Sequence, residues 1–565
     1  MRLNIRSKME NTYDAIVVGT GISGGWAAKE LTEKGLKTLV LERGRNVNHI
    51  EDYPTMLDKP WQIPNNDELP AEEAQHYKKQ MRTGYTVKET TKHWWVKDTV
   101  HPYEEKKRFD WIRGYHVGGR SIMWGRQSYR LAPMDFEANA RDGIGVDWPI
   151  RYSDIEQWYD YVEGFAGISG QNEGLDQLPD GNFLPPMDLN CVEEDMKQRL
   201  MEEFGRVLTI GRTANLTQPH NGRGKCMYRN LCIRGCPYGG YFSSNAATLP
   251  AAEATGNMTL RPHSVVRSLI YDEEFGKATG VQVTDAQTGE TIEYYADIIF
   301  LNASTVNSTL ILMNSRSNRF PIGLGNDSGE LGHNLMDHHY RVGASGEIEG
   351  YDDRYYFGKR PNGFYIPRFR NIGSDKRDYI RGFGYQGSAS RQDWKRGVRE
   401  LAIGKPLKDL VRTPGKWTAG MGGFGEMLPY HENRMYLNYD NKDEFGLPTV
   451  VFDCEFKENE LKMREDMKND AAEMLESSGF KNVYTFDDPG GPGLGIHEMG
   501  TARMGRDPES SVLNEWNQVH SCKNVFVTDG ACMTSAACQN PSLTYMALTA
   551  RAADYAVNEL KKGNL

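Results

Sequence analysis

A glycine-rich turn near the start of the chain limits the fold more than any other feature. The apolar run Tyr13 to Val18 leads directly into Gly19-Thr-Gly21-Ile-Ser-Gly24, and the residues from Trp26 to Lys34 have the pattern of a helix. A second apolar run, Thr38 to Leu41, ends at Glu42. These segments predict a strand, a helix and a second strand, which is the opening unit of a doubly wound α/β domain.

Each glycine of this turn has its own steric role. Gly19 allows the tight turn, Gly21 lets the backbone approach a pyrophosphate, and Gly24 permits close packing of helix on strand. The N-terminus of the helix favours the phosphate charge, and Glu42, followed by Arg43, is placed to accept a hydrogen bond from a ribose hydroxyl. The pattern therefore predicts a bound dinucleotide, with a merely tight turn as the alternative. It does not separate NAD from FAD.

Three cysteines gather in a second glycine-rich segment. Cys226, Cys232 and Cys236 lie within eleven residues, and Pro237 follows the last of them. Thiolates are soft ligands that suit iron–sulfur clusters, and three ligands indicate a [3Fe-4S] cluster. A disulfide with one spare thiol and three inert buried cysteines remain as alternatives. The surrounding glycines predict a wrapped loop over 220–240 in place of a helix or strand.

The composition excludes several classes of protein. A chain of 565 residues, 38% of them apolar, can form two or more structural units around a large core. The formal net charge of −10 argues against a nucleic-acid partner, because such proteins concentrate Lys and Arg on one face. No apolar run is long enough to span a membrane, and the start lacks the apolar stretch of a secretory signal. We therefore expect no anchor and no export signal of the chain's own.

The composition and the periodicity of the sequence change beyond the opening unit. The residues from 51 to 113 are polar with little periodicity, which predicts an excursion between pieces of the nucleotide domain. Between 341 and 480, apolar residues alternate in Gly363–Phe369, Arg434–Tyr439 and Thr449–Phe456. This alternation predicts a second domain built on a largely antiparallel sheet.

Four further motifs resemble, in order along nearly the whole chain, those of the glucose–methanol–choline (GMC) flavin oxidoreductases. They are Gly118-Gly119-Arg-Ser-Ile-Met-Trp124-Gly125, Leu331-Gly332-His-Asn334-Leu-Met-Asp337-His338, Val527-Thr-Asp529-Gly530 and Asn540-Pro541-Ser-Leu-Thr544. The resemblance implies a Rossmann-type FAD-binding domain with a second, largely antiparallel-sheet substrate domain. It assigns 1–50, 110–135, 215–340 and 490–565 to the FAD-binding domain. The substrate-binding domain and excursions then take 51–109, 136–214 and 341–489.

The resemblance also implies how FAD is held. Gly118, Gly119, Asp529 and Gly530 are expected to contact the flavin nucleotide, and the backbone of Val266 its adenine. Met123 stands where some relatives carry the histidine that links the flavin covalently, so the FAD is expected to be noncovalent. A metal site at His333, His338, His339 and Asp337 is the alternative reading of one motif, but that segment fits the flavin domain of the family.

Oxidation of an alcohol requires a hydroxyl proton and a carbon-bound hydride to leave in different directions. Neutral histidine is the usual base for such a proton near neutral pH. By resemblance His497 is that base, Asn540 orients the hydroxyl, and the flavin N5 accepts the hydride.

Within the family, the chain looks most like the bacterial sugar dehydrogenases, and specifically the glucoside 3-dehydrogenase group. These proteins carry a [3Fe-4S] cluster on a three-cysteine loop with the spacing of Cys226, Cys232 and Cys236. We therefore expect oxidation at C3 of a glucoside, with electrons leaving through the cluster. Glucose C1 or gluconate C2 oxidation is one alternative, and an electron-transfer flavoprotein subunit without sugar chemistry is another.

The resemblance further implies a small companion subunit and a cytochrome c acceptor. Co-export with such a subunit predicts a periplasmic location, and the cytoplasm is the alternative.

Overall fold

The glycine-rich turn joins the elements that the sequence predicts. In the computed structural model, which describes residues 10–393 and 402–565, β1 (Thr12–Val18) leads through the turn into α2 (Ile22–Glu33) and then β2 (Thr38–Leu41). The helix begins four residues before the expected Trp26, because Gly21 already serves as its N-cap. β1 and β2 pair in parallel, with Ala15 opposite Thr38.

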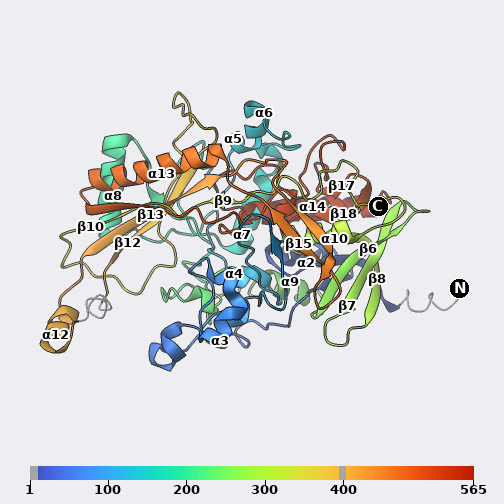
Figure 1. Ribbon diagram of the computed structural model, residues 1–565, viewed down its shortest axis with the longest axis horizontal. Helices are drawn as coiled ribbons and strands as arrows, with labels where there is room; N and C mark the ends of the chain where they lie inside the picture. Colours follow the sequence, from blue (N-terminus) through green and yellow to red (C-terminus); the bar gives the residue numbers. More distant parts are fainter. Residues whose placement is uncertain (1–9, 394–401) are drawn as a thin grey trace.

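An eight-stranded sheet is built around this unit, in the order β17-β18-β8-β1-β2-β5. The added strands are β5 (Met258–Arg261), β8 (Thr291–Leu301), β17 (Gln518–Val519) and β18 (Cys522–Val527). β18, β8, β1, β2 and β5 run parallel, and the hairpin β6 (Ser264–Asp272) and β7 (Lys277–Asp285) adds to β8 antiparallel. Three distant parts of the chain thus meet in one sheet, on the right of Figure 1.

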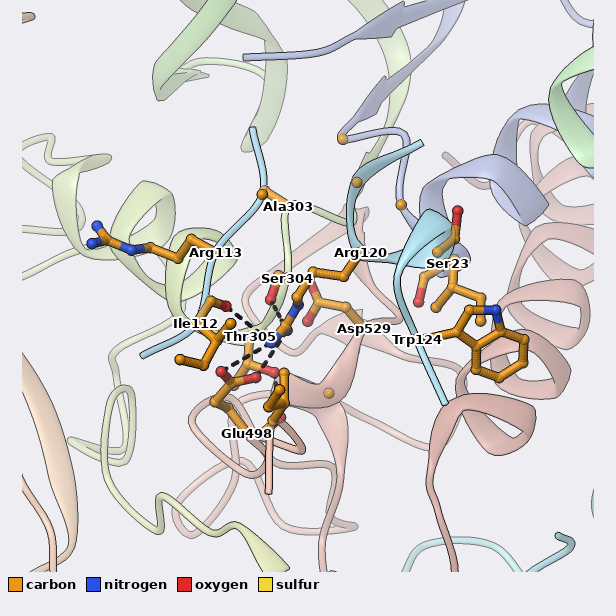
Figure 2. A pocket seen from close by; sticks show the side chains of 18 of the residues that line it. Ser23, Ile112, Arg113, Arg120, Trp124, Ala303, Ser304, Thr305, Glu498 and Asp529 are labelled. Carbon is orange, nitrogen blue, oxygen red and sulfur yellow. Dashed lines mark hydrogen bonds and ion pairs between the residues drawn. The ribbon is translucent and has the colours of Figure 1, made fainter. Parts of the chain in front are cut away.

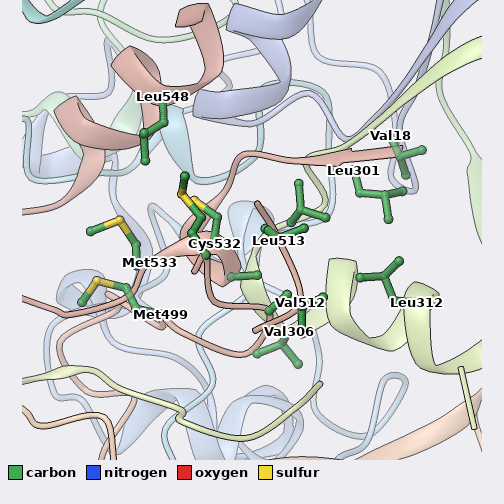
Figure 3. Packing of buried hydrophobic residues seen from close by; sticks show 14 of the residues in the cluster. Val18, Leu301, Val306, Leu312, Met499, Val512, Leu513, Cys532, Met533 and Leu548 are labelled. Atoms are coloured by element: carbon green, nitrogen blue, oxygen red, sulfur yellow. The ribbon is translucent and has the colours of Figure 1, made fainter. Parts of the chain in front are cut away.

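Buried apolar side chains hold the helices against this sheet. α2 packs against α9 (Thr248–Ala254) and α14 (Ser542–Lys561), α14 also packs against α7 (Glu156–Ala166), and α10 (Thr305–Asn314) packs against β6. Figure 3 shows part of the largest cluster, in which strand residues Val18 and Leu301 share a core with Val306 and Leu312 of α10, and with Met499, Cys532 and Met533. Close packing of this kind fixes the strand ends from which the site is built.

A second, seven-stranded sheet is antiparallel throughout, which confirms the expected second sheet. Its order is β16-β10-β13-β12-β11-β4, with β9 paired to β13. Its strands are β4 (Thr209–Ile210), β9 (His338–His339), β10 (Val342–Ile348), β11 (Phe364–Ile366), β12 (Phe383–Arg391), β13 (Trp417–Glu426) and β16 (Lys481–Asp487). α13 (Glu458–Ser477) packs on β10, β13 and β16, and α8 (Cys191–Phe204) contacts both α13 and β12 (Figure 1).

Two segments expected among the strands of the second domain form a separate sheet. β14 (Arg434–Lys442) and β15 (Pro448–Asp453) make an antiparallel hairpin, extended by β3 (Glu104–Glu105). Phe452 of β15 stacks on Phe109 with ring centroids 4.1 Å apart and lies edge-on to Trp111. The hairpin therefore leaves the large antiparallel sheet because its apolar side chains join the core of the first region.

The remaining helices are short or peripheral: α3 (Ala71–Ala74), α4 (Lys78–Met81), α5 (Pro133–Phe136), α6 (Ala138–Asp142) and α12 (Gly404–Arg412). The segment 220–240 is a loop with a single 3-10 turn at Cys232–Arg234, which confirms the expected loop. Along the described ranges, no helix combines the length and apolarity needed to cross a membrane. The predicted domain boundaries stay a prediction.

Candidate active site

A cavity of about 610 Å³ runs from the glycine-rich turn to His497 and Asn540. It brings together most of the site residues expected from the sequence: Gly19, Gly21, Glu42, Arg43, Gly119, Val266, His497, Asp529, Gly530 and Asn540. Gly24 and Gly118 do not line it but pack immediately behind its wall. The roles predicted for these side chains remain predictions, while their assembly around one cavity is a feature of the fold.

The three turn glycines meet three different steric demands. A Cβ on Gly19, whose φ is +98°, would lie 2.4 Å from the carbonyl oxygen of Asn302. A Cβ on Gly24 would lie 2.0 Å from the Gly19 carbonyl oxygen. At Gly21 a Cβ would meet no protein atom within 4 Å, so this glycine leaves open space at the N-terminus of α2. Open space beside helix N–H groups fits a pyrophosphate.

The double glycine, Gly118 and Gly119, and the side chain of Glu42 support the glycine-rich turn from behind. The Gly118 N–H donates to Thr20 Oγ1 at 2.9 Å, and Thr20 Oγ1 donates to Glu42 Oε2 at 2.5 Å. The backbone N–H groups of Thr20 and Gly44 also donate to Glu42, at 3.2 and 3.0 Å. Burial raises the pKa of Glu42. In this structure the carboxylate braces the turn, and its bond to a ribose hydroxyl stays a prediction.

An ion pair that the sequence analysis missed crosses the middle of the cavity wall (Figure 2). Arg120 donates to both carboxylate oxygens of Glu498, at 3.1 and 2.8 Å, and to Ser304 Oγ at 2.9 Å. Arg120 directly follows the double glycine and Glu498 directly follows His497, so their positions beside two motifs were the available signal. A bidentate pair of this kind fixes both segments in one geometry.

Asp529 lies behind this pair, at the end of β18. It accepts from Ser308 Oγ at 2.5 Å and from the Ala531 N–H at 3.0 Å. Burial raises the pKa of Asp529 to about 6. Asp529 and Gly530 thus line the cavity just beyond the end of β18, and their contact with FAD stays a prediction.

Several buried polar atoms of the described cavity-lining residues have no protein partner, and two of them can accept a hydrogen bond. In the part of the chain that the structure describes, Asn302 Oδ1 and the Tyr545 hydroxyl make no hydrogen bond. Buried polar groups are nearly always paired, so these atoms indicate a ligand with its own polar groups. Together with the open space at Gly21, they fit a dinucleotide such as FAD.

At the other end of the cavity, His497 and Asn540 form the predicted pair. Asn540 Oδ1 accepts from Gln386 Nε2 at 2.5 Å, which leaves Asn540 Nδ2 facing His497 Nε2 at 3.5 Å. The second ring nitrogen of His497, Nδ1, lies 2.8 Å from His338 Nδ1. Burial, followed by the charges of His338 and Arg120, lowers the pKa of His497 well below its ordinary value. Burial therefore favours the neutral form of the His497 ring.

Side chains from the second sheet complete this end. Gln386 comes from β12, and Phe424 of β13 stacks on Tyr340 with ring centroids 5.1 Å apart. The side-chain amides of Gln127 and Asn362 lie 3.2 Å apart on the same wall. No sequence signal marked Gln386, Gln127 or Asn362, because only the folded chain brings the β12 residue Gln386 and the loop residues Gln127 and Asn362 to one cavity.

The cysteine loop lies outside the cavity lining, apart from Ile233. All eight cysteines are free thiols, so the disulfide alternative does not occur in the structure. Burial raises the pKa of Cys226 to about 11, and the neighbouring thiols of Cys232 and Cys236 add to this effect. Within residues 10–393 and 402–565, no group of three or more His, Cys, Asp or Glu side chains could hold a metal ion. The structure thus gathers the three predicted ligands in one loop without a ready-made cluster site.

Comparison with known proteins places these features in a family. Sequence models described as GMC oxidoreductase match residues 13–340 and residues 429–549. The 2-methyl-1,2-propanediol dehydrogenase of Mycolicibacterium austroafricanum is 28% identical over 572 residues, covering 96% of this chain and 94% of the relative. The fructose dehydrogenase large subunit of Gluconobacter japonicus is 25% identical over 581 residues, covering 97% of this chain and 98% of the relative.

Solved structures show the same fold. Pyridoxine 4-oxidase from Mesorbium loti superposes with a TM-score of 0.60 at 16% identity, covering 96% of this chain and 98% of its own. At this level of identity the likeness concerns the fold alone.

Proposed function

The chain belongs to the GMC oxidoreductase family, and we propose on that basis that it is an FAD-dependent dehydrogenase that oxidises a secondary hydroxyl of a sugar or glycoside. The observation that carries the proposal is the pair of polar atoms His497 Nε2 and Asn540 Nδ2, which converge 3.5 Å apart on a cavity that reaches the glycine-rich turn. The names of the relatives, a diol dehydrogenase and a fructose dehydrogenase subunit, support an alcohol or sugar substrate.

The lining of the reacting end favours a polyhydroxylated ring. Gln127, Asn362 and Gln386 offer amide donors and acceptors, while Phe424 and Tyr340 offer an apolar face. A site that pairs several polar groups with one aromatic face suits a sugar ring, which carries hydroxyls around its rim and C–H bonds on its faces.

The protein's own part in the reaction follows from the site. His497 is neutral, so its Nε2 accepts the proton of the hydroxyl that is being oxidised. Asn540 is oriented by Gln386 and donates from Nδ2 to the same oxygen, which holds the reacting carbon in place. When bound, FAD supplies the acceptor for the hydride at its N5 atom.

For the position of attack, we propose C3 of a glucoside, as the sequence resemblance led us to expect. Stopped-flow flavin bleaching with methyl glucoside is the first experiment, because its methyl acetal blocks oxidation at C1. Methyl glucoside deuterated at C3 should slow flavin reduction, whereas deuterium at C2 should leave the rate unchanged. A rate effect from C2 alone would assign C2 oxidation. No bleaching by methyl glucoside, with bleaching by free glucose, would assign C1.

A matched pair of variants tests the role of the reacting pair. Asn540→Ala should keep FAD but slow flavin reduction, because the hydroxyl loses its second partner. Gln287 is exposed, lies in the β7–β8 turn and does not line the cavity, so Gln287→Ala should reduce its flavin at the rate of the original protein. If no sugar or glycoside bleaches the flavin of the original protein or of Gln287→Ala, the chain is an electron-transfer subunit and the proposal is wrong.

The proposed electron exit is a [3Fe-4S] cluster on Cys226, Cys232 and Cys236, with a cytochrome c as acceptor and a small companion subunit. Three free soft ligands in one glycine-rich loop support the donor chemistry. The side chains must close around the cluster, since they do not frame a metal site in the structure. Iron analysis should find about three irons per chain, with the EPR signal of an oxidised [3Fe-4S] centre. An iron-free protein that still reduces cytochrome c would overturn this part. We also propose that the chain is exported to the periplasm together with the small companion subunit.

A further inference from the structure

The catalytic histidine has a second histidine behind it. His338 lies at the start of β9, fully buried, and its ring is nearly perpendicular to that of His497, at 82° with centroids 4.9 Å apart. One of its ring nitrogens, Nε2, lies 2.9 Å from the carbonyl oxygen of Ala537. The other, Nδ1, lies 2.8 Å from His497 Nδ1. The two rings therefore form a chain from a backbone carbonyl to the cavity.

The carbonyl at the end of this chain decides where the protons lie. A carbonyl oxygen can only accept, so His338 must carry a proton on Nε2. Burial lowers the pKa of His338 to about 4, so at neutral pH its Nδ1 has no proton and can only accept. His497 must then donate from Nδ1, which leaves Nε2 without a proton. This nitrogen is the one that faces Asn540 and the cavity.

We propose that His338 is a positioning residue that fixes the tautomer of His497, so that the unprotonated Nε2 faces the substrate hydroxyl. The inference rests on the proposed function, in which His497 is the base. Asn540 Nδ2 favours the same tautomer, but at 3.5 Å it is at the limit of a hydrogen bond and restrains His497 weakly. His338, at 2.8 Å, supplies the stronger restraint.

The residue before His338 holds the backbone of the same loop. Asp337 accepts from the N–H groups of Gly493, Gly495 and His497, at 2.7, 2.8 and 3.1 Å. Ile496, just before His497, has a φ of +58°, which is strained for a β-branched residue. These three hydrogen bonds hold the strained turn, so Asp337 fixes the backbone of His497 while His338 fixes its ring.

Other charged or titratable groups near the pair leave this proton order in place. Arg120, paired with Glu498, lowers the pKa of His497 further and so favours its neutral form. His339 follows His338 in β9, and its pKa lies well below the ordinary value because of burial. Adjacent strand residues point to opposite faces, and the His339 ring packs edge-on against Phe456. Asp337 is occupied by backbone donors.

Histidine NMR tests the tautomer without any substrate. In the holoenzyme labelled with [15N]histidine, the ring-nitrogen shifts distinguish a protonated from an unprotonated nitrogen, and the His497→Ala and His338→Gln variants assign the signals. We expect His497 in the Nδ1–H form and His338 in the Nε2–H form. In His338→Leu, His497 should become a mixture of tautomers. Nε2–H in the original protein, or unchanged Nδ1–H in His338→Leu, would overturn the proposal.

Kinetics separates positioning from simple packing. His338→Leu fills the buried space with an apolar side chain but lacks the nitrogen that accepts from His497 Nδ1. Sugar-driven flavin reduction should therefore slow by at least about tenfold. Loss of a tautomer-fixing group in a catalytic triad costs up to about 10⁴-fold. His338→Gln offers an amide N–H to Ala537 and an amide oxygen to His497, and should recover most of the rate. His339→Leu is the control on the same strand and should leave the tautomer unchanged. Equal losses in the Leu and Gln variants, with FAD retained, would mean that the ring acts by packing alone.

The two readouts also separate this inference from the proposed function. If no sugar or glycoside reduces the flavin but the NMR shows the expected proton order, the substrate assignment fails and the positioning stands. If sugar reduces the flavin but His338→Leu does so at full rate, the function stands and the positioning role fails.

Discussion

Replacing Gly21 by alanine adds one methyl group at the point where the dinucleotide is expected to approach the backbone. The new Cβ meets no protein atom within 4 Å, and the Gly21 angles, φ −64° and ψ −163°, are open to alanine. The free energy of unfolding of the protein without FAD should therefore stay equal or rise by about 0.4–1 kcal/mol, because alanine restricts the unfolded chain. The stability of the fold gives no reason for a glycine here.

The cofactor supplies the reason. A methyl group forced into a close contact typically costs about 1–3 kcal/mol, which corresponds to FAD binding that is about 5-fold to 150-fold weaker at 1.4 kcal/mol per factor of ten. Release of flavin fluorescence on dilution of the holoenzyme measures this loss, and urea unfolding measures the fold. Both assays are needed, since the prediction is that FAD binds more weakly while the free energy of unfolding does not fall.

Two further glycines act as controls. Gly164 is exposed in α7, and its Cβ would also meet nothing within 4 Å, so Gly164→Ala should bind FAD normally. Gly24→Ala places a Cβ 2.0 Å from the Gly19 carbonyl oxygen and should lower the free energy of unfolding by about 1–3 kcal/mol or more. If Gly21→Ala retained FAD as tightly as Gly164→Ala, the pyrophosphate would not pass over this turn and our reading of the nucleotide site would be refuted.

Further measurements test the reacting end and the thiol loop. His497→Ala should keep its FAD and slow flavin reduction by about 10²- to 10⁴-fold, whereas a rate within a few-fold of the original would assign the base elsewhere. Because the pKa of His497 lies well below its ordinary value, flavin reduction should be independent of pH between about pH 6 and 8 and fall only in acid; a rate that rises through this range would contradict the neutral histidine. Burial, with the charge of Glu498, raises the pKa of Asp337 to about 7 from 3.8. The folded protein then holds a proton that the unfolded chain releases, so its free energy of unfolding should fall as the pH rises from about 4 to 7. Urea titrations at pH 5 and pH 8 measure this fall. The fall should be absent in Asp337→Asn, whose side chain does not titrate. Cys232→Ser should lower the iron content and cytochrome c reduction while sugar still bleaches the flavin; equal loss of both activities would place the loop in the sugar site.

The opening unit of this protein could be predicted from the sequence because its determinants are local. Gly19, Gly21 and Gly24 lie within one turn, and the strand Thr38–Leu41 was predicted with its observed bounds. The antiparallel second sheet was predicted from three alternating segments, of which only Gly363–Phe369 lies in it, as β11. The pair His497 and Asn540 came from motif resemblance, and the fold places both on one cavity.

Long-range contacts decided the rest. The sequence shows β14 and β15 as alternating strands, but only the packing of Phe452 on Phe109 shows that they leave the large antiparallel sheet. Gln386 reaches Asn540 across 154 positions, and His338 reaches His497 across 159. Alternating side chains and turn residues depend on neighbours in the chain. The hydrogen bonds of Gln386 to Asn540 and of His338 to His497 form only when distant segments pack together in the folded protein. The sequence therefore predicted which histidine is the base, and the tertiary structure placed His338 against one nitrogen of that ring and Asn540 against the other.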